Sequence, residues 1–443
     1  NDGTFIFGAS GGTQTYNGGL NTASVDGTVT LNGTIATSND AVVLGAVTLA
    51  SATTVDTNAT SNAADITIAA ITGGSNNLTL STGNNIAGAD ITASGAISGL
   101  GNLILADVGG TATFSNNVAA AALSAANTVA NITFTGNFNG TTNTFSAAST
   151  LANDGTLTFG SSTADSFTFN GGLTTSSVAG TVTLNTSISS SDDALTFGAV
   201  TLGNNEITID TNSTTTNRAD ITLGAITGGN NNLTLITGNN VTGSDITASG
   251  NISGVPTLRL AGVGGTATLS GDVDVTTLII DATVANVAFT GNGSSVANSF
   301  TPDNDGTFIF GASGGTQTYN GGLNTASVDG TVTLNGTIAT SNDVVVLGAV
   351  TLASATTIDT NASSNAGDIT IAAITGGSQN LTLSTGDNIA GADVTASGAI
   401  SGLGNLILAD VGGTATFSNN VAAAALSAAN TVANITFTGS TNT

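Results

Sequence analysis

Aspartate residues at a fixed spacing are the side chains in this sequence with the clearest potential for chemistry. Each precedes a short run of apolar and polar residues, and in three stretches the Asp returns after 25 residues. If the runs stack, carboxylates about 5 Å apart would repel one another and could share Ca²⁺, which prefers oxygen ligands. The weak calcium candidates are Asp40, Asp65, Asp90, Asp220, Asp245, Asp343, Asp368 and Asp393.

A structural role is the alternative for the same aspartates. A carboxylate beside a turn readily accepts hydrogen bonds from backbone N–H groups, and salt screens the repulsion between neighbours. We favour this role because the repeating Gly-Asp pattern of calcium-binding repeats is not present. We therefore assign no metal and no cofactor to the chain from its sequence.

Catalytic residues of the usual types are scarce. The sequence has no His, Lys or Cys, so no such group could activate one of the many Ser and Thr hydroxyls. Asp192 and Asp193 form the one acidic doublet, and adjacent residues of a strand usually point apart. We therefore expect that the chain is not an enzyme and has no catalytic residues.

The elements that position the aspartates are predicted to be short strands. The stretch from Ala64 to Leu105 matches itself after a shift of 25 residues, which brings Asp65 onto Asp90. Runs such as 66–68 and 78–80 alternate apolar and polar residues, and Gly, Asn, Ser and Asp separate them. Alternation at period two is typical of strands, and the spacers are turn formers. The pattern predicts an all-β parallel solenoid with coils of about 25 residues.

A longer repeat contains the short one. Residues 1–136 recur as 304–439 without a gap and with seven substitutions, and a diverged copy begins at Asn153. We predict a unit A at 1–152, a diverged unit B at 153–303 and an incomplete second unit A at 304–443. Each unit of about 152 residues would hold about six coils, and the three would form one continuous rod.

The seven substitutions between the two A copies test the strand assignment. Exchanges of one apolar residue for another are predicted to face inward, and the remaining exchanges are predicted to lie in turns. Arg259 replaces Ile104 between two leucines and is predicted to point outward. The alanine-rich run from Val118 to Ala126 is interpreted as a strand in preference to a short helix. The predicted inward exchanges are Ala41 to Val344, Val55 to Ile358 and Ile91 to Val394, and the predicted turn exchanges are Thr60 to Ser363, Ala64 to Gly367, Asn76 to Gln379 and Asn84 to Asp387.

Composition and charge limit the partners. The formal net charge is −25, with two Arg as the only basic side chains, which disfavours nucleic acid and anionic membranes. Apolar residues make up 40% of the chain, so the low hydrophobicity of a disordered chain is missing. The run from Val118 to Ala126 is shorter than the roughly 18–20 residues of a membrane span, so no membrane insertion is expected. Because the sequence opens within a repeat and without Met, we expect it to be a segment of something longer.

Two strings carry a resemblance to a known class of proteins. NNLTLSTGNNIAG at 76–88 and DITASGAISGLGNLIL at 90–105 resemble the repeats of secreted bacterial β-solenoid proteins. These are the filamentous-haemagglutinin-like and autotransporter-passenger adhesins and the β-strand repeat surface proteins. The resemblance implies a right-handed parallel β-solenoid, export to the cell surface and a role in adhesion, matrix or surface-layer building. It carries over no functional residues.

The expected function follows from the repeats and from this resemblance. We expect a non-enzymatic, extracellular structural protein that forms or belongs to a filament, sheath or surface matrix. Its expected partner is itself, as an end-to-end or lateral homopolymer, and Asn-X-Thr sequons such as 77–79 could carry glycans. The alternatives are the stalk of a bacterial adhesin and a calcium-dependent surface-layer protein.

Overall fold

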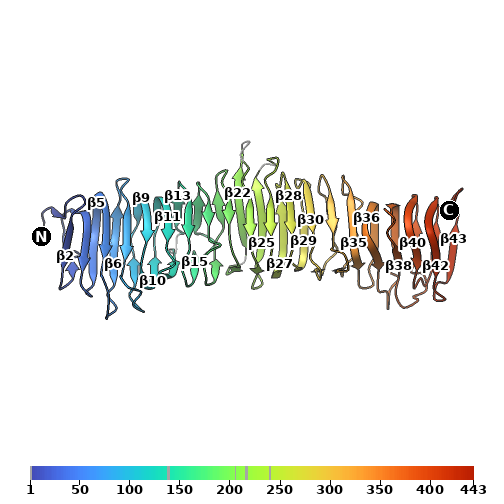
Figure 1. The fold of residues 1–443 in the computed structure, drawn as a ribbon, viewed down its shortest axis with the longest axis horizontal. Helices are drawn as coiled ribbons and strands as arrows, with labels where there is room; N and C mark the ends of the chain where they lie inside the picture. Colours follow the sequence, from blue (N-terminus) through green and yellow to red (C-terminus); the bar gives the residue numbers. More distant parts are fainter. Residues whose placement is uncertain (1, 137–139, 205, 215–217, 239–240) are drawn as a thin grey trace. The chain divides into compact units, whose positions relative to one another are not determined.

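The structure is a computed structural model, and it describes residues 2–136, 140–204, 206–214, 218–238 and 241–443. These residues form an all-β parallel β-solenoid of about 19 turns, and they contain no helix (Figure 1). The chain divides into two compact units, unit 1 at Asn1–Gly224 and unit 2 at Ala225–Thr443. The division falls inside the predicted unit B, and the three repeat units stay a prediction from the sequence.

Unit 1 contains strands that are mostly three to nine residues long, and one strand, β5, has 15 residues. Its strands are β1 Phe5–Phe7, β2 Thr13–Tyr16, β3 Leu20–Asn21, β4 Val29–Thr37, β5 Val42–Asp56, β6 Ile66–Thr72, β7 Leu78–Ser81, β8 Ile91–Ala93, β9 Ile97–Leu105, β10 Val108–Phe114, β11 Val118–Ala125, β12 Val129–Phe134, β13 Thr142–Phe145, β14 Ser149–Leu151, β15 Leu157–Phe159, β16 Ser166–Phe169, β17 Leu173–Thr174, β18 Val182–Leu184, β19 Ile188–Ser190, β20 Leu195–Thr196, β21 Val200–Leu202, β22 Glu206–Ser213 and β23 Ile221–Leu223.

Unit 2 has the same kind of strands, and β36 corresponds in sequence and length to β5. Its strands are β24 Ile226–Thr227, β25 Asn232–Gly238, β26 Ile246–Ala248, β27 Ile252–Ala261, β28 Thr266–Leu269, β29 Val273–Ile280, β30 Asn286–Phe289, β31 Ser295–Val296, β32 Phe308–Phe310, β33 Thr316–Tyr319, β34 Leu323–Asn324, β35 Val332–Ala339, β36 Val345–Asp359, β37 Ile369–Thr375, β38 Leu381–Ser384, β39 Val394–Ala396, β40 Ile400–Leu408, β41 Thr414–Phe417, β42 Val421–Ala428 and β43 Asn434–Phe437.

Alternation decides which side chains enter the core. In β6, Ile66 and Ile68 are fully buried while Thr67 between them is half-buried. Leu78 and Leu80 of β7 repeat the pattern around Thr79. Successive residues of a strand point to opposite faces, so one face of each strand lines the narrow interior of its coil. The strands predicted at 66–68 and 78–80 are therefore confirmed. The alanine-rich run is also a strand, as interpreted, over Val118–Ala125.

The predicted coil length of 25 residues is wrong for the chain as a whole, since the coils average about 22 residues. Ile66 pairs with Ile91, which is the spacing that the sequence pattern revealed. Val29, however, pairs with Val47, and Ile91 pairs with Ala112. The strands keep their register while the turns between them vary in length. A stretch of 152 residues consequently holds about seven coils of 22 residues, not six.

The substitutions between the A copies mostly lie where they were predicted. Positions 55 and 358, and 91 and 394, are fully buried and apolar in both copies. The prediction that Ala41 and Val344 face inward is wrong, because Ala41 is exposed and Val344 is 47% exposed. The four remaining exchanges lie outside strands as predicted, although Ala64 is buried there. Arg259 points outward between the buried Leu258 and Leu260.

Candidate functional site

The aspartates of the predicted calcium ladder accept hydrogen bonds from the backbone of the next coil. Asp65 Oδ1 accepts from the N–H of Asp90 at 2.9 Å, and Asp90 Oδ1 accepts from the N–H of Thr111 at 2.7 Å. In each case the donor is the register partner of the Asp, because Ile66 pairs with Ile91 and Ile91 with Ala112. These carboxylates join one coil to the next at the point where a strand begins.

Unit 2 repeats the arrangement. Asp368 Oδ1 accepts from the N–H of Asp393 at 2.9 Å, and Asp393 Oδ1 accepts from the N–H of Thr414 at 2.7 Å. Asp245 Oδ1 accepts from the N–H of Thr266 at 2.7 Å. Backbone N–H groups are thus partners of these carboxylates, as the structural alternative expects. The N–H groups belong to the neighbouring coil and not to the turn of the Asp itself.

Asp40 and Asp343 lie one residue out of register with the others. Val42 pairs with Ile66, so Ala41 and not Asp40 is aligned with Asp65. In unit 2 Val345 pairs with Ile369, which aligns Val344 with Asp368. The equal spacing of 25 residues therefore does not produce a three-residue ladder in either unit. The same shift explains why Ala41 and Val344 are exposed, since they occupy the outward position of the Asp.

Asp220 belongs to unit 1 and Asp245 belongs to unit 2. The backbone oxygen of Asp220 accepts a hydrogen bond of 3.0 Å from the N–H of Leu195. In the part of the chain that the structure describes, no group of three or more His, Cys, Asp or Glu side chains could hold a metal ion. Calcium binding by these aspartates stays the alternative that the sequence left open.

Asparagine performs the same role as Asp at many strand starts. Asn77 Oδ1 accepts from the N–H of Asn102 at 2.8 Å, and Asn131 Oδ1 accepts from the N–H of Thr156 at 2.9 Å. We call this set of Asp and Asn side chains, each bonded to the backbone of its register partner one coil on, the Asx ladder. Its members share a sequence signal, an Asx immediately before an inward apolar residue. Its members include Asp65, Asn77, Asp90, Asn131, Asn232, Asp245, Asn286, Asp368, Asn380 and Asp393.

Asp165 is a buried carboxylate that the spacing of the sequence did not single out. Its side chain is 3% exposed and accepts hydrogen bonds from the N–H groups of Thr141, Ser161 and Ser162 at 2.7, 2.9 and 3.1 Å. The hydroxyl of Thr141 also donates to Asp165 at 2.7 Å. Burial alone would raise the pKa of Asp165, but these hydrogen bonds together outweigh burial and lower the pKa. The carboxylate therefore joins the turn at Ser161 and Ser162 to Thr141 in the preceding coil.

In the acidic doublet, the side chain of Asp192 and the backbone of Asp193 form hydrogen bonds. Asp192 has a positive φ of 65°, and its Oδ1 accepts from the N–H of Thr214 at 2.7 Å. The backbone oxygen of Asp193 accepts from the hydroxyl of Ser190 at 2.5 Å. Nearby Asp210 has its pKa raised by burial, and the hydrogen bond from the N–H of Asn212 offsets only part of that effect. These contacts stabilise turns.

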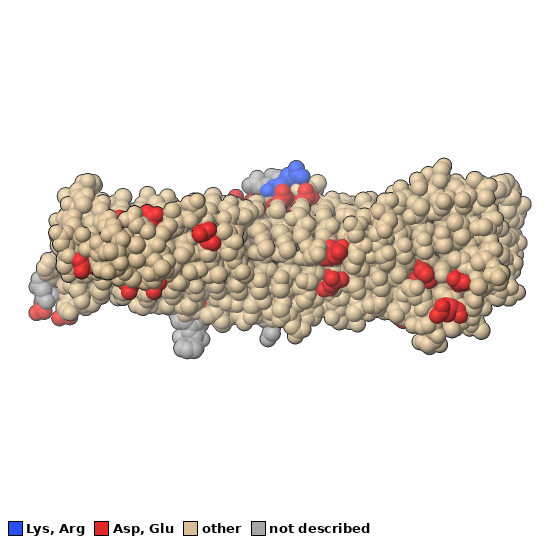
Figure 2. All heavy atoms as spheres, turned by 60° about the horizontal axis from the view of Figure 1, so that its bottom comes forward, with Lys and Arg blue, Asp and Glu red and all other residues tan. Residues whose placement is uncertain are grey.

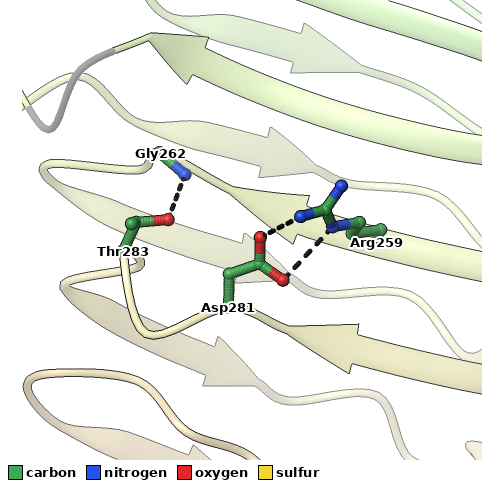
Figure 3. Close-up of polar contacts among 4 residues, drawn as sticks. All are labelled: Arg259, Gly262, Asp281 and Thr283. Carbon is green, nitrogen blue, oxygen red and sulfur yellow. Dashed lines mark hydrogen bonds and ion pairs between the residues drawn. The ribbon is translucent and has the colours of Figure 1, made fainter.

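Arg259 forms an exposed ion pair one coil away. Its Nε and Nη2 donate to the two carboxylate oxygens of Asp281 at 3.2 and 2.5 Å (Figure 3). Beside them the N–H of Gly262 donates to Thr283 Oγ1 at 2.9 Å (Figure 3). The hydrogen bond and the charge of Asp281 raise the pKa of Arg259. The pair links neighbouring coils across the surface, as the Asx ladder does nearer the turns.

Charge is dispersed over the face of the molecule that Figure 2 draws. On the face drawn in Figure 2, acidic side chains lie singly or in small groups with uncharged surface between them. Basic side chains are seen in one place on that face, next to acidic ones (Figure 2). Within the described ranges there is no helix that is long and apolar enough to cross a membrane.

Comparison with known proteins gives no further guide to the site. No protein-family model, no curated protein and no solved structure matches the chain. The class that the structure itself defines is the all-β parallel β-solenoid. The resemblance to secreted bacterial repeat proteins stays a prediction from the sequence.

Proposed function

We propose that this chain is a non-enzymatic structural protein of the bacterial cell surface, which forms or belongs to an extracellular filament, sheath or matrix. It works by the stacking of right-handed β-solenoid coils in repeat units of about 152 residues. Its partner is another copy of the same chain. Nucleic acid, lipid bilayers and small substrates are not its ligands.

The Asx ladder is the observation that carries this proposal. Neighbouring coils are held by parallel strand pairing and, at many strand starts, by an additional side-chain bond such as Asp65 to Asp90 or Asn131 to Thr156. A force along the stacking direction would load the strand pairing of every coil and, where the Asx ladder is present, the side-chain bond as well. Such redundancy suits a protein whose task is mechanical and not chemical.

The core supports the same role. Phe134 lies between Phe114 and Phe159, with ring centroids 5.1 and 5.9 Å away and nearly parallel rings. Stacked aromatic rings and aliphatic residues repeat from coil to coil, so each added coil contributes similar burial. The sequence repeats the same core pattern along the chain, and we propose that this repetition serves the structural role.

The proposal is tested on the cells that make the protein. Immunogold labelling with an antibody against the chain should mark extracellular fibres or a surface layer of uniform repeat. An antibody against a cytosolic protein serves as the control. Label confined to the cytosol would refute the proposal, and label on isolated surface molecules with a distinct tip would favour an adhesin stalk instead.

A further inference from the structure

A buried asparagine occupies the same corner of a coil in unit 1 and in unit 2. Asn153 and Asn304 each begin the sequence Asn-Asp-Gly-Thr, and both are fully buried. Neither lies in a strand, because each stands at the corner that precedes a short strand, β15 in unit 1 and β32 in unit 2. A side-chain amide has N–H donors at one end and a carbonyl acceptor at the other, so burial requires partners for both ends.

The nitrogen of each amide is satisfied by backbone carbonyls. Asn153 Nδ2 donates to the oxygens of Gly155 and Thr156, both at 3.0 Å. It also lies 3.3 Å from the oxygen of Ala130 in the preceding coil. These carbonyls fix the orientation of the amide, because an oxygen in place of Nδ2 would face three acceptors. The equivalent partners of Asn304 Nδ2 in unit 2 are the oxygens of Gly306 at 3.0 Å, Thr307 at 3.1 Å and Ala285 at 3.5 Å.

The oxygen of each amide is different. Asn153 Oδ1 and Asn304 Oδ1 are buried and have no hydrogen-bond partner among the residues that the structure describes. Asn143 provides the contrast, since it is just as buried but its Oδ1 accepts from the N–H of Val118 at 3.0 Å. Burial of an acceptor without a donor is unfavourable, and folded proteins rarely keep one. The same unpartnered oxygen in two units therefore indicates a shared property of this corner.

In unit 1 a second unpartnered group belongs to the same corner, one coil further along the chain. Thr175 is fully buried, and within the described ranges its hydroxyl oxygen has no hydrogen-bond partner. The N–H of Val178 donates to the backbone oxygen of Thr175 at 3.0 Å and closes a turn. The next residue, Ala179, donates its N–H to the backbone oxygen of Asn153 at 3.1 Å. This turn therefore lies directly on Asn153, and the two buried side chains share one corner of the interior.

We infer that each of these corners binds one internal water molecule, which donates a hydrogen bond to Asn153 Oδ1 in unit 1 and to Asn304 Oδ1 in unit 2. In unit 1 the hydroxyl of Thr175 is the second partner of the water. A water molecule fits this chemistry because it donates to a carbonyl oxygen, exchanges a hydrogen bond with a hydroxyl and carries no charge that burial would penalise. It links one coil to the next inside the solenoid. This inference does not depend on the proposed function.

High-resolution crystallography of the full chain tests the site directly. We expect an isolated density peak about 2.8 Å from Oδ1 of Asn153 and of Asn304, with the peak in unit 1 also within hydrogen-bond distance of Thr175 Oγ1. Asn143 is the internal control, because Val118 already donates to its Oδ1 and no such peak should lie there. Absence of a peak at both corners, or a protein donor in its place, would overturn the inference. An anomalous peak there after a soak in RbCl would also overturn it, since the ligand would then be a monovalent cation.

Magnetic relaxation dispersion of the water signal counts long-lived internal waters in solution. The double variant Asn153→Leu/Asn304→Leu removes both acceptors and should lose two of the long-lived waters of the wild type. Thr175→Val keeps the shape of the side chain and removes its hydroxyl, so it should shorten the residence time of one water while the circular dichroism spectrum stays that of the wild type. Equal water counts in the wild type and the folded double variant would overturn the inference. If the double variant does not fold, Thr175→Val and the crystal structure decide, and an unchanged residence time would overturn the role of Thr175.

Discussion

Asp65 Oδ1 accepts a hydrogen bond of 2.9 Å from the backbone N–H of Asp90, its register partner one coil further along the chain. The bond extends the backbone pairing of β6 and β8 by one residue before the two strands, at the position where a turn ends and a strand begins. Asp368 and Asp393 make the same bond in unit 2. Loss of this acceptor should therefore weaken the contact between two coils in either unit.

Two substitutions of Asp65 distinguish the effect of its hydrogen-bond acceptor from the effect of its negative charge. Asp65→Asn keeps Oδ1 and should change the free energy of unfolding little, whereas Asp65→Ala leaves the N–H of Asp90 without its acceptor and should cost about 1–2 kcal/mol. Hydrogen exchange of the Asp90 amide, followed by mass spectrometry or NMR, measures the local effect. Asp40→Ala is the matched control, because Asp40 lies out of register with Asp65. Equal effects of the two Ala substitutions would contradict the role given to the ladder.

Calcium provides a separate test of the same residues. Since Oδ1 of Asp65, Asp90, Asp368 and Asp393 already accepts backbone N–H groups, we expect millimolar CaCl₂ and excess EDTA to give the same Tm. Differential scanning calorimetry at constant ionic strength makes the comparison, with MgCl₂ as the control salt. A Tm that rises with calcium and falls again with EDTA would instead favour the surface-layer alternative. In that event Asp65→Asn/Asp368→Asn should abolish the rise.

Asp165 should make stability depend on pH in a defined direction. Its pKa in the folded chain lies below the ordinary 3.8, so the unfolded chain binds more protons between the two values. Its stabilising contribution is complete above pH 3.8 and is lost as the pH falls through the lowered pKa. In Asp165→Asn an amide replaces the carboxylate that accepts from three N–H groups. This variant should lose about 2–3 kcal/mol of the free energy of unfolding at pH 7. Urea unfolding at pH 3 and pH 7 should show a smaller cost at the lower pH.

Asp210 is the matched control for Asp165. Burial raises its pKa, so its contribution is complete below the ordinary 3.8 and is lost as the pH rises through the raised value. Asp210→Asn keeps an acceptor for the N–H of Asn212 and removes the partly buried charge. We expect this variant to be as stable as the wild type or slightly more stable at pH 7. A cost at pH 7 similar to that of Asp165→Asn would show that the two carboxylates do not differ as described.

Much of the fold could be predicted because apolar and polar residues alternate within each short strand. Ile66 and Ile68 are buried on either side of Thr67, and any alternating run of this kind fixes which face turns inward. Coil length could not be predicted in the same way. Ile66 pairs with Ile91, 25 residues further along the chain. Val29 pairs with Val47, which is closer in sequence, because the turns of that coil are shorter while its strands still pair in register.

The candidate site shows the same limit. Equal spacing suggested that Asp40 is aligned with Asp65 and Asp90. The coil between Val42 and Ile66 is one residue shorter than 25, so Ala41 is aligned with Asp65 instead. A shift of one residue reverses inward and outward positions, so the inward assignment of Ala41 failed for the same reason. Asp165 was missed because Thr141, which bonds it, lies in a different coil and shares no motif with it. The Asx immediately before an inward residue is a better signal than spacing.

The two copies of Asn-Ile-Thr-Phe allow one packing prediction with an internal control. Phe134 is 1% exposed between Phe114 and Phe159, whereas Phe437 stacks on Phe417 at 4.8 Å and is only half-buried. Phe134→Ala should lower the free energy of unfolding by about 3–5 kcal/mol, since it opens a cavity within the core. Phe437→Ala should cost about 1 kcal/mol in dilute solution, because part of the ring already contacts water.

Guanidinium unfolding measures the free energy of unfolding of both variants and of the wild type. Equal losses of stability in Phe134→Ala and Phe437→Ala would contradict the difference in burial between the two rings.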